Sequence, residues 1–247
     1  MQQISQRLAD LVARGRDVVV LTGAGMSAES GVATFRGAGG LWENEPVERV
    51  ATPEGFAHDP LRVWRFYEAR RQQIAGVAPH AGHRALADYA ARHPGIVTVT
   101  QNIDGLHQAA GVEEVIELHG SLMRVRCTRD GGAREDRRVP FPALPPRCDC
   151  GAMLRPDVVW FGEALPEAAF ARAHDASRRA ALFLVIGTSA LVYPAAGLPA
   201  VASAAGAWVV EINPEPTPIS DQVDEVLRGP AGAILPALLG AVPTPDR

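Results

Sequence analysis

The chain has 247 residues, 47% of them hydrophobic and 21% charged, which is enough for one or two globular domains with a sizeable core. Its net charge of −4 gives no reason to expect a nucleic-acid or membrane surface, and no stretch approaches the roughly 18 apolar residues of a transmembrane helix. Three cysteines and an N-terminus without a signal-peptide pattern predict a cytoplasmic protein rather than a secreted, disulfide-bonded one.

Helix and strand signals alternate along the first part of the chain. Apolar residues at helical spacing predict a helix over residues 3–14, and the β-branched run 18–21 predicts a buried parallel strand. After a glycine-rich turn, residues 34–42 are expected to form a long loop. Two helices then follow, one over residues 60–75 and one over 80–92.

The second part continues the alternation around one interruption. Strands are predicted at 96–100 and 115–118, with a short helix ending near Gly111 between them. Residues 127–156 are rich in Arg, Pro, Gly and Cys and predict an insertion or small subdomain. The remaining predictions are helices over 166–181, 194–205 and 230–239 and strands over 182–186, 207–212 and 223–227. Alternating strand and helix is typical of an α/β fold with a doubly wound, Rossmann-like parallel sheet and helices on both faces.

Polar clusters follow directly after the predicted strands. Taken singly, each cluster is better explained as a helix cap or a turn than as a binding site. Together they would line one rim of the sheet, where open α/β folds bind dinucleotides. The clusters are Gly23-Ala24-Gly25, Gln101-Asn102-Ile103-Asp104, His119-Gly120, Gly187-Thr188-Ser189 and Asn213-Pro214-Glu215.

The glycine-rich turn departs from the fingerprint of dehydrogenases. That fingerprint continues into a full helix and a second strand that ends in an acidic residue about 20 residues on. Here Ser30-Gly31 interrupts the helix at once, and Glu43 and Glu45 follow no predicted strand. A dinucleotide covered by a loop fits this pattern better than hydride transfer does.

One histidine is a candidate general base. His119 lies after a predicted strand and before Gly120, at the rim, and an imidazole titrates near neutral pH. A lone histidine is more often a packing or surface residue. His107 is the main competitor in the same region.

Taken together, these motifs resemble the sirtuin family, whose members are NAD-dependent protein-lysine deacylases. The resemblance covers nearly the whole chain and implies a Rossmann-like domain (1–33, 77–121 and 164–247) and a small domain (34–76 and 122–163) made of a helical module and a zinc-ribbon-like insertion. It rests on Gly23–Gly31, Thr34-Phe35-Arg36, Gln101–Asp104, Leu118-His119-Gly120, Gly187-Thr188-Ser189 and Asn213.

The resemblance also implies a mechanism. NAD is a consumed co-substrate: the acyl oxygen attacks the ribose, nicotinamide leaves, and His119 acts as general base, assisted by Asn102 and Asp104 of the nicotinamide pocket. The products are free lysine, nicotinamide and O-acyl-ADP-ribose. The implied NAD contacts are Gly23, Ala24, Gly25, Ser27, Phe35, Arg36, Trp42, Gln101, Asn102, Ile103, Asp104, Gly187, Thr188, Ser189, Asn213 and Ala231.

The implied partners are acyl-lysine proteins. The segment 155–163, with Val158, Val159 and Phe161, resembles the part of the family that pairs with the substrate backbone as an added strand. Tyr67 and Arg70 are three residues apart on a predicted helix, so they share a face, and an arginine fork suits a carboxylate. The alternative is a solvated arginine beside a core tyrosine.

Tyr-x-x-Arg, with Ala51 nearby, resembles the class III or desuccinylase-type sirtuins. Succinyl-, malonyl- and glutaryl-lysine are then the expected substrates, and acetyl-lysine is still accepted. Two other activities stay open within the family: one mainly of deacetylation, and ADP-ribosyl transfer. Outside it, a nicotinamide-dependent oxidoreductase and a non-catalytic NAD-binding module remain alternatives.

The metal site is incomplete by comparison with the family. Sirtuins usually carry two Cys-x-x-Cys pairs that hold structural zinc. Here Cys127 is followed at that spacing by Asp130, and the second pair is shortened to Cys148-Asp149-Cys150. Three thiolates and a carboxylate can bind zinc; a metal-free ribbon held by packing is the alternative.

Overall fold

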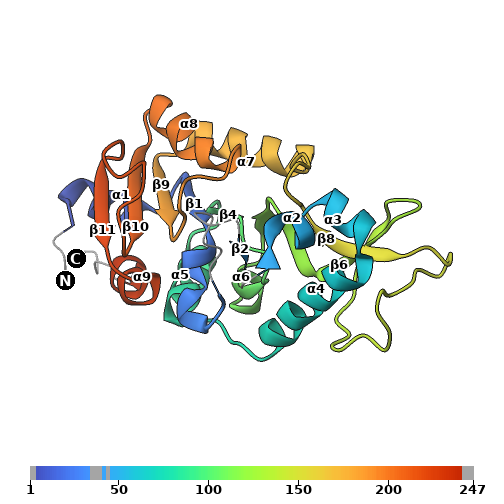
Figure 1. Cartoon of the computed structure of the whole chain (residues 1–247). Helices are drawn as coiled ribbons and strands as arrows, with labels where there is room; N and C mark the ends of the chain where they lie inside the picture. The colour runs from blue at the N-terminus through green and yellow to red at the C-terminus, as the bar shows by residue number, and fades with distance from the viewer. Residues whose placement is uncertain (1–3, 34–40, 43–44, 241–247) are drawn as a thin grey trace.

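The computed structural model describes residues 4–33, 41–42 and 45–240. A parallel sheet of six strands, in the order β11-β10-β9-β1-β4-β5, forms the centre of the larger part of the molecule (Figure 1). The order reverses direction at β1, as in doubly wound folds, which confirms the predicted fold class. The strands are β1 (Val18–Thr22), β4 (Val97–Thr100), β5 (Val115–Glu117), β9 (Leu182–Ile186), β10 (Trp208–Asn213) and β11 (Glu225–Arg228).

Helices cover both faces of this sheet because alternate side chains of each strand point to opposite faces. Val18 and Val20 belong to the core formed with α1, α5 and α9, whereas Val19 and Leu21 belong to the core formed with α7 and α8. Buried on both faces, β1 therefore reads as an unbroken apolar run. The helices are α1 (Gln6–Arg14), α5 (Ala81–Arg92), α7 (Glu167–Arg179), α8 (Leu198–Ala204) and α9 (Ala231–Gly240).

A second core lies in the smaller part of the molecule, to the right in Figure 1. It joins α4 to a three-stranded antiparallel sheet of order β7-β6-β8, which we call the ribbon sheet. Six buried residues of this core are aromatic: Phe56, Trp64, Phe66, Tyr67, Phe141 and Trp160. The elements are α2 (Val47–Val50), α3 (Pro53–His58), α4 (Pro60–Ala75), β6 (Gly120–Cys127), β7 (Ala133–Glu135) and β8 (Leu154–Val158).

The helix α4 is fixed at its start and along its length. Asp59 caps it by accepting from the Arg62 N–H at 2.9 Å, and Pro60 needs no N–H partner in the first turn. Trp64 Nε1 donates to the Leu154 carbonyl at 2.8 Å, and Arg71, 1% exposed, donates to carbonyls of the ribbon segment. These contacts hold α4 against the ribbon sheet.

Three local predictions are wrong. Leu41–Trp42 (β2) pairs antiparallel with Glu45–Pro46 (β3), so the loop predicted over 34–42 ends in a strand and Glu45 lies within one. The helix predicted over 194–205 is a 3-10 turn followed by α8, because Pro199 lacks the N–H that a continuous helix would use. The predicted subdomain 127–156 is wider, since its sheet begins at Gly120.

The glycines of the first loop face protein backbone. A Cβ on Gly25 would lie 2.8 Å from Gly187 Cα, and one on Gly187, whose φ is +58°, would lie 2.3 Å from the Met26 nitrogen. Gly25 N–H donates to the Gly187 carbonyl at 2.7 Å. Close contact between these two loops therefore requires glycine at both positions. None of the helices in the described ranges is long and apolar enough to cross a membrane.

Candidate active site

The strand register brings the polar clusters to one rim of the sheet. Thr22 at the end of β1 pairs with Thr100 and Ile186, and Ile186 pairs with Ile212. The segments that follow β1, β4, β9 and β10 therefore leave the sheet at the same edge. This confirms the predicted grouping of the clusters, at the position where doubly wound folds bind ligands.

A buried hydrogen-bond network joins the first two clusters. Asn102 Nδ2 donates to the Gly23 carbonyl at 3.0 Å and to Ser27 Oγ at 3.2 Å. The Ser27 hydroxyl donates to Asp104 Oδ2 at 2.7 Å. Burial raises the pKa of Asp104, while the Leu106 N–H and the Ser27 hydroxyl oppose that change by hydrogen bonding to the carboxylate. The network holds three polar side chains in a fixed arrangement beside the glycine-rich loop.

A second set of contacts joins the remaining clusters. Gln101 Nε2 donates to Thr188 Oγ1 at 3.0 Å, and Asn213 Nδ2 donates to the Thr188 carbonyl at 2.9 Å. Ser189 is exposed beside Ala190, which adopts a positive φ of 55°. A non-glycine residue in that conformation is strained, and such strain is concentrated at functional sites.

The environment of His119 fixes its tautomer. Its Nδ1 lies 2.9 Å from the Gln101 carbonyl oxygen, which can only accept, so Nδ1 carries the hydrogen and Nε2 keeps its lone pair. Burial lowers the pKa of His119, which favours the neutral ring. Gly120 follows with a φ of +81°, and a Cβ there would lie 2.1 Å from the Asp157 oxygen. This histidine can therefore accept a proton at the rim.

His107, the competing histidine, lies in the core. It is 1% exposed, and its Nε2 is 2.9 Å from Thr22 Oγ1 beneath the rim. Burial lowers its pKa to about 4. Because it is buried and contacts the Thr22 hydroxyl, His107 is a packing residue and not the general base.

The segment expected to bind substrate lies at the edge of the ribbon sheet. Residues 155–158 of this segment belong to β8 (Leu154–Val158), which is an outer strand of the described ribbon sheet and pairs with β6. Val159 N–H donates to the His119 carbonyl at 2.9 Å, and Phe161 N–H donates to the Ala51 carbonyl at 3.0 Å. Phe161 is 44% exposed. An edge strand beside the histidine has the geometry that addition of a further strand requires.

Tyr67 and Arg70 lie on α4 but have different partners. Tyr67 is fully buried, and its hydroxyl accepts from Trp160 Nε1 at 3.0 Å; desolvation raises its pKa. The Arg70 guanidinium stacks 4.0 Å from the centre of the Phe66 ring and donates to the Phe66 carbonyl. The joint use of both side chains on one carboxylate, expected from their spacing, remains a prediction.

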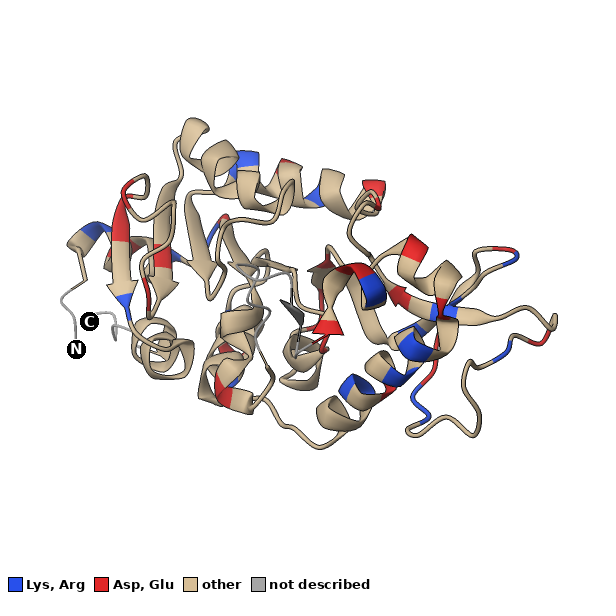
Figure 2. Ribbon diagram, in the orientation of Figure 1, with Lys and Arg blue, Asp and Glu red and all other residues tan. Residues whose placement is uncertain are grey.

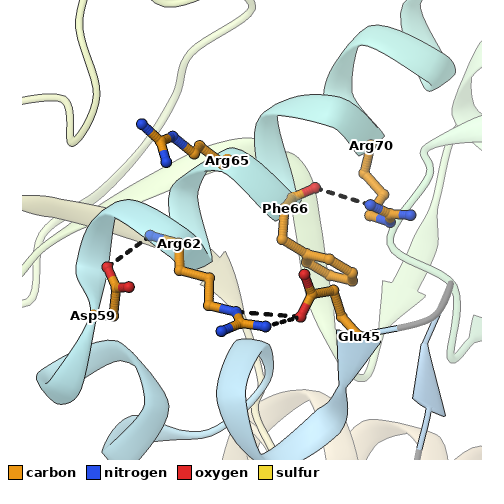
Figure 3. A pocket seen from close by; sticks show the side chains of 6 residues that line it. All are labelled: Glu45, Asp59, Arg62, Arg65, Phe66 and Arg70. Carbon is orange, nitrogen blue, oxygen red and sulfur yellow. Dashed lines mark hydrogen bonds and ion pairs between the residues drawn. The ribbon is translucent and has the colours of Figure 1, made fainter.

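A pocket of about 530 Å³ opens beside Arg70 (Figure 3). Arginines of α4 line it, and Figure 2 shows their positive charge along that helix. Burial lowers the pKa of Arg70 to about 10, which leaves it a cation at neutral pH. Glu45 offsets part of the charge through its ion pair with Arg62 at 2.6 Å. The pocket is therefore basic at its Arg70 end. Its lining residues are Glu45, Asp59, Arg62, Arg65, Phe66 and Arg70.

The three cysteines gather at the far end of the ribbon sheet. Their sulfur atoms all lie within 4.8 Å of one another, with 3.6 Å between those of Cys127 and Cys150. Zinc–sulfur bonds of about 2.3 Å at tetrahedral angles place sulfurs about 3.8 Å apart, so the thiols fit zinc. The close spacing of Cys148 and Cys150 does not prevent this. Asp130, the expected fourth ligand, accepts from the Gly132 N–H at 2.8 Å.

Comparison with known proteins decides the family. The model of the Sir2 family matches residues 23–194, which include the glycine-rich loop, the network of Asn102, Ser27 and Asp104, His119 and the ribbon sheet. The chain belongs to the Sir2 family. The sirtuin resemblance seen in the sequence is thereby confirmed.

Relatives of this Sir2-family chain carry names that describe an activity. It is 51% identical over 209 residues to an "NAD-dependent protein deacylase" of Aquifex aeolicus, covering 84% of this chain and 87% of the relative. It is 50% identical over 238 residues to "NAD-dependent protein deacylase 2" of Pyrobaculum aerophilum, covering 95% and 94%.

Solved structures agree with this fold. A Sir2 homolog–NAD complex superimposes with a TM-score of 0.90 at 42% identity, covering 97% of this chain and 94% of that one. A complex of Sir2 with a p53 peptide and NAD⁺ gives a TM-score of 0.83 at 30% identity, with 96% and 98% covered.

The remaining predicted site residues of this Sir2-family chain either make main-chain contacts or lie outside the described residues. Ala231 is buried at the first position of α9, and the next N–H, of Gly232, donates to Glu29 Oε2 at 2.6 Å. The Ile103 carbonyl accepts from the Leu122 N–H. Phe35 and Arg36 lie outside the described residues, as does the side chain of Trp42. Glu29 was not among the predicted site residues, because its partner Gly232 lies 203 residues away in the sequence.

Purified protein is expected to carry about one zinc per chain, because three converging thiolates form most of a tetrahedral site. Hydrogen bonding from the Cys150 N–H and Arg134 lowers the pKa of Cys148 to about 7, which favours the ligating thiolate. Elemental analysis of the protein checks this, with Cys127→Ser as the depleted variant. Zinc far below one equivalent in the unaltered protein would establish the metal-free ribbon instead.

Proposed function

We propose that this Sir2-family chain removes acyl groups from protein lysines at the expense of NAD, producing nicotinamide and O-acyl-ADP-ribose. The observation that carries the proposal is the 2.9 Å contact of His119 Nδ1 with the Gln101 carbonyl, which leaves Nε2 to accept a proton beside the network of Asn102, Ser27 and Asp104. The names of the relatives and the NAD found in related structures support it.

The rim residues fit NAD by the kind of groups they offer. When bound, NAD supplies an activated ribose carbon with nicotinamide as leaving group. Asp104 and Asn102 present buried hydrogen-bonding groups suited to a carboxamide, and the loops at Gly25 and Ser189 suit the rest of the dinucleotide. His119 accepts a proton from a ribose hydroxyl through Nε2.

The acyl-lysine peptide is proposed to join the outer edge of β8 and the residues after it. Main-chain pairing there gives affinity with little sequence preference. It would also bring the lysine beside His119, since Val159 is bonded to the His119 carbonyl. Val158 and Phe161, in the same segment, and Ala51, bonded to Phe161, are proposed to shape the entrance.

We further propose that the preferred acyl groups carry a terminal carboxylate, as succinyl and malonyl groups do. Arg70 is a cation lining an open basic pocket, and a guanidinium binds a carboxylate through two parallel hydrogen bonds. Acetyl-lysine is accepted as well, because nothing in this arrangement excludes a shorter chain.

Three smaller points belong to the same proposal. The Rossmann-like domain comprises 1–33, 77–121 and 164–247 and the small domain 34–76 and 122–163, a division that the separate cores support. The protein works in the cytoplasm. It acts on proteins without binding nucleic acid directly, in keeping with its net charge of −4.

Mass spectrometry of succinyl-, malonyl- and acetyl-lysine peptides, incubated with and without NAD, tests the proposal. NAD-dependent loss of the acyl mass with equimolar nicotinamide is the expected result. Formation of NADH would identify an oxidoreductase, and transfer of ADP-ribose to the peptide would identify the transferase alternative. Binding of NAD without turnover would reduce the chain to a binding module.

A further inference from the structure

Two carboxylates from different sheets face one arginine beside the catalytic rim. Glu117 is the last residue of β5 in the six-stranded sheet, and Asp157 lies on β8 in the ribbon sheet. Arg124 Nη1 lies 2.5 Å from Glu117 Oε2, and Arg124 Nε lies 2.9 Å from Asp157 Oδ2. One guanidinium therefore bridges the two sheets.

The bridge is protected from water on its acidic side. The side chain of Glu117 is 12% exposed and that of Asp157 7%, against 34% for Arg124. Gln108 Nε2 donates to the other oxygen of Glu117, and Arg126 Nε donates to the other oxygen of Asp157, both at 2.9 Å. Each of the four carboxylate oxygens thus has a donor, which is the condition under which a buried ion pair holds its geometry.

Arg124 also lies where the main-chain ladder between β6 and β8 is interrupted. Ser121 pairs with Asp157, but the next pair is Val125 with Pro156, so residues 122–124 of β6 have no partner in that ladder. The Arg124 side chain crosses back to Asp157 at this irregularity. The Arg124 side chain therefore joins β6 to β8 at the point where the main-chain hydrogen-bond ladder between these strands is interrupted.

Both carboxylates lie two residues before functional positions. Glu117 precedes His119, and Asp157 precedes Val159, whose N–H donates to the His119 carbonyl at 2.9 Å. Glu117 is the last residue of β5, and the bend at 118–119 follows it directly, so an anchored Glu117 fixes the start of the bend that carries His119. The bridge thus spans the same gap as the bond between His119 and Val159.

We propose that Arg124 is a positioning residue: through Glu117 and Asp157 it holds the end of β5, which leads into His119, against the peptide-binding edge of β8. This rests on the proposed function, because the bridge matters only if it holds His119 at a fixed distance from an acyl-lysine bound along β8. Arg126 is the matched contrast: it binds the same Asp157, with Nη2 at 2.6 Å from Oδ1, but the contacts of the described residues do not join it to β5.

Hydrogen exchange tests this positioning role without any need for activity. In Arg124→Gln, exchange of peptides covering residues 157–162 is expected to become at least about tenfold faster, while peptides from α1 and α9 stay unchanged. Arg126→Gln is expected to leave residues 157–162 close to the unaltered protein. Equal protection in the two variants, or a uniform loss throughout the chain, would overturn the proposal.

Kinetics supplies the functional arm. Arg124→Gln is expected to raise KM for an acyl-lysine peptide and lower kcat, with the Kd for NAD unchanged; Arg124→Lys, a point charge without the fork, should recover only part of the loss. If Arg124→Gln does not fold, Glu117→Gln weakens the same link at nearly constant volume and takes its place. If the unaltered protein shows no deacylase activity but Arg124→Gln still speeds exchange at residues 157–162, the positioning role of Arg124 stands and only the proposed function is rejected.

Discussion

Replacing His119 with alanine is expected to lower kcat/KM by about 10²–10⁴-fold, the usual contribution of a general base. The Kd for NAD should stay within a few-fold, because the Nδ1 of His119 bonds only the Gln101 carbonyl and the polar contacts of Asn102 and Thr188 remain. Nicotinamide release measures turnover, and calorimetric titration measures NAD binding.

The pH profile gives an independent check on the same residue. Burial lowers the pKa of His119 from its ordinary value near 6.5, so the neutral, proton-accepting ring persists to more acidic pH. The value of kcat/KM should therefore rise with pH through a pKa below 6.5 and be level at neutral pH. His58→Ala, at an exposed position of α3, serves as the control and should leave both measurements unchanged. Full activity of His119→Ala would remove this histidine from the mechanism.

Replacing Arg70 with methionine is expected to lower kcat/KM for succinyl- and malonyl-lysine peptides by about 10–150-fold. This corresponds to losing a charged hydrogen bond, which contributes about 1.5–3 kcal/mol. Deacetylation should change no more than a few-fold, because an acetyl group carries no carboxylate. Steady-state kinetics on matched peptides that differ only in the acyl group measures the ratio.

Arg65→Met separates a direct contact from the general charge of the pocket. Arg65 lines the same pocket from the same helix but is exposed, so its replacement removes the same charge at a more solvated position. It should change desuccinylation far less than Arg70→Met does. Equal losses of desuccinylation and deacetylation in Arg70→Met would mean that the residue supports the fold of α4 rather than reading the acyl carboxylate.

The sequence predicted the parallel sheet well because its signals are local. The run Val18–Leu21 is apolar on both faces of β1, and the residues after each strand are those that turns and caps prefer. Parallel strands place their carboxyl ends on one edge, so the rim followed from the order of the elements alone. The His119 position was predictable in the same way, from its place directly after a strand.

Contacts between distant segments were not predictable by pattern. The demand for glycine at 23, 25 and 187 comes from two loops that meet backbone to backbone, more than 160 residues apart in the chain. The hydrogen bond that Tyr67 accepts from Trp160 joins residues 93 positions apart, and helical spacing gives no sign of it. The thiols converge because β6 and the segment after β7 bring Cys127 to Cys148 and Cys150.

The cations of this molecule share one chemical type. All 24 basic side chains of the sequence are arginines, including those that bridge the sheets and line the pocket. Lysine amines are the groups that acylation neutralises, whereas the guanidinium stays charged. Reactive acyl thioesters would therefore modify lysines on other proteins but leave the ion pairs of this one intact. The protein would keep its own charges under the conditions that produce the acyl-lysines it is proposed to remove.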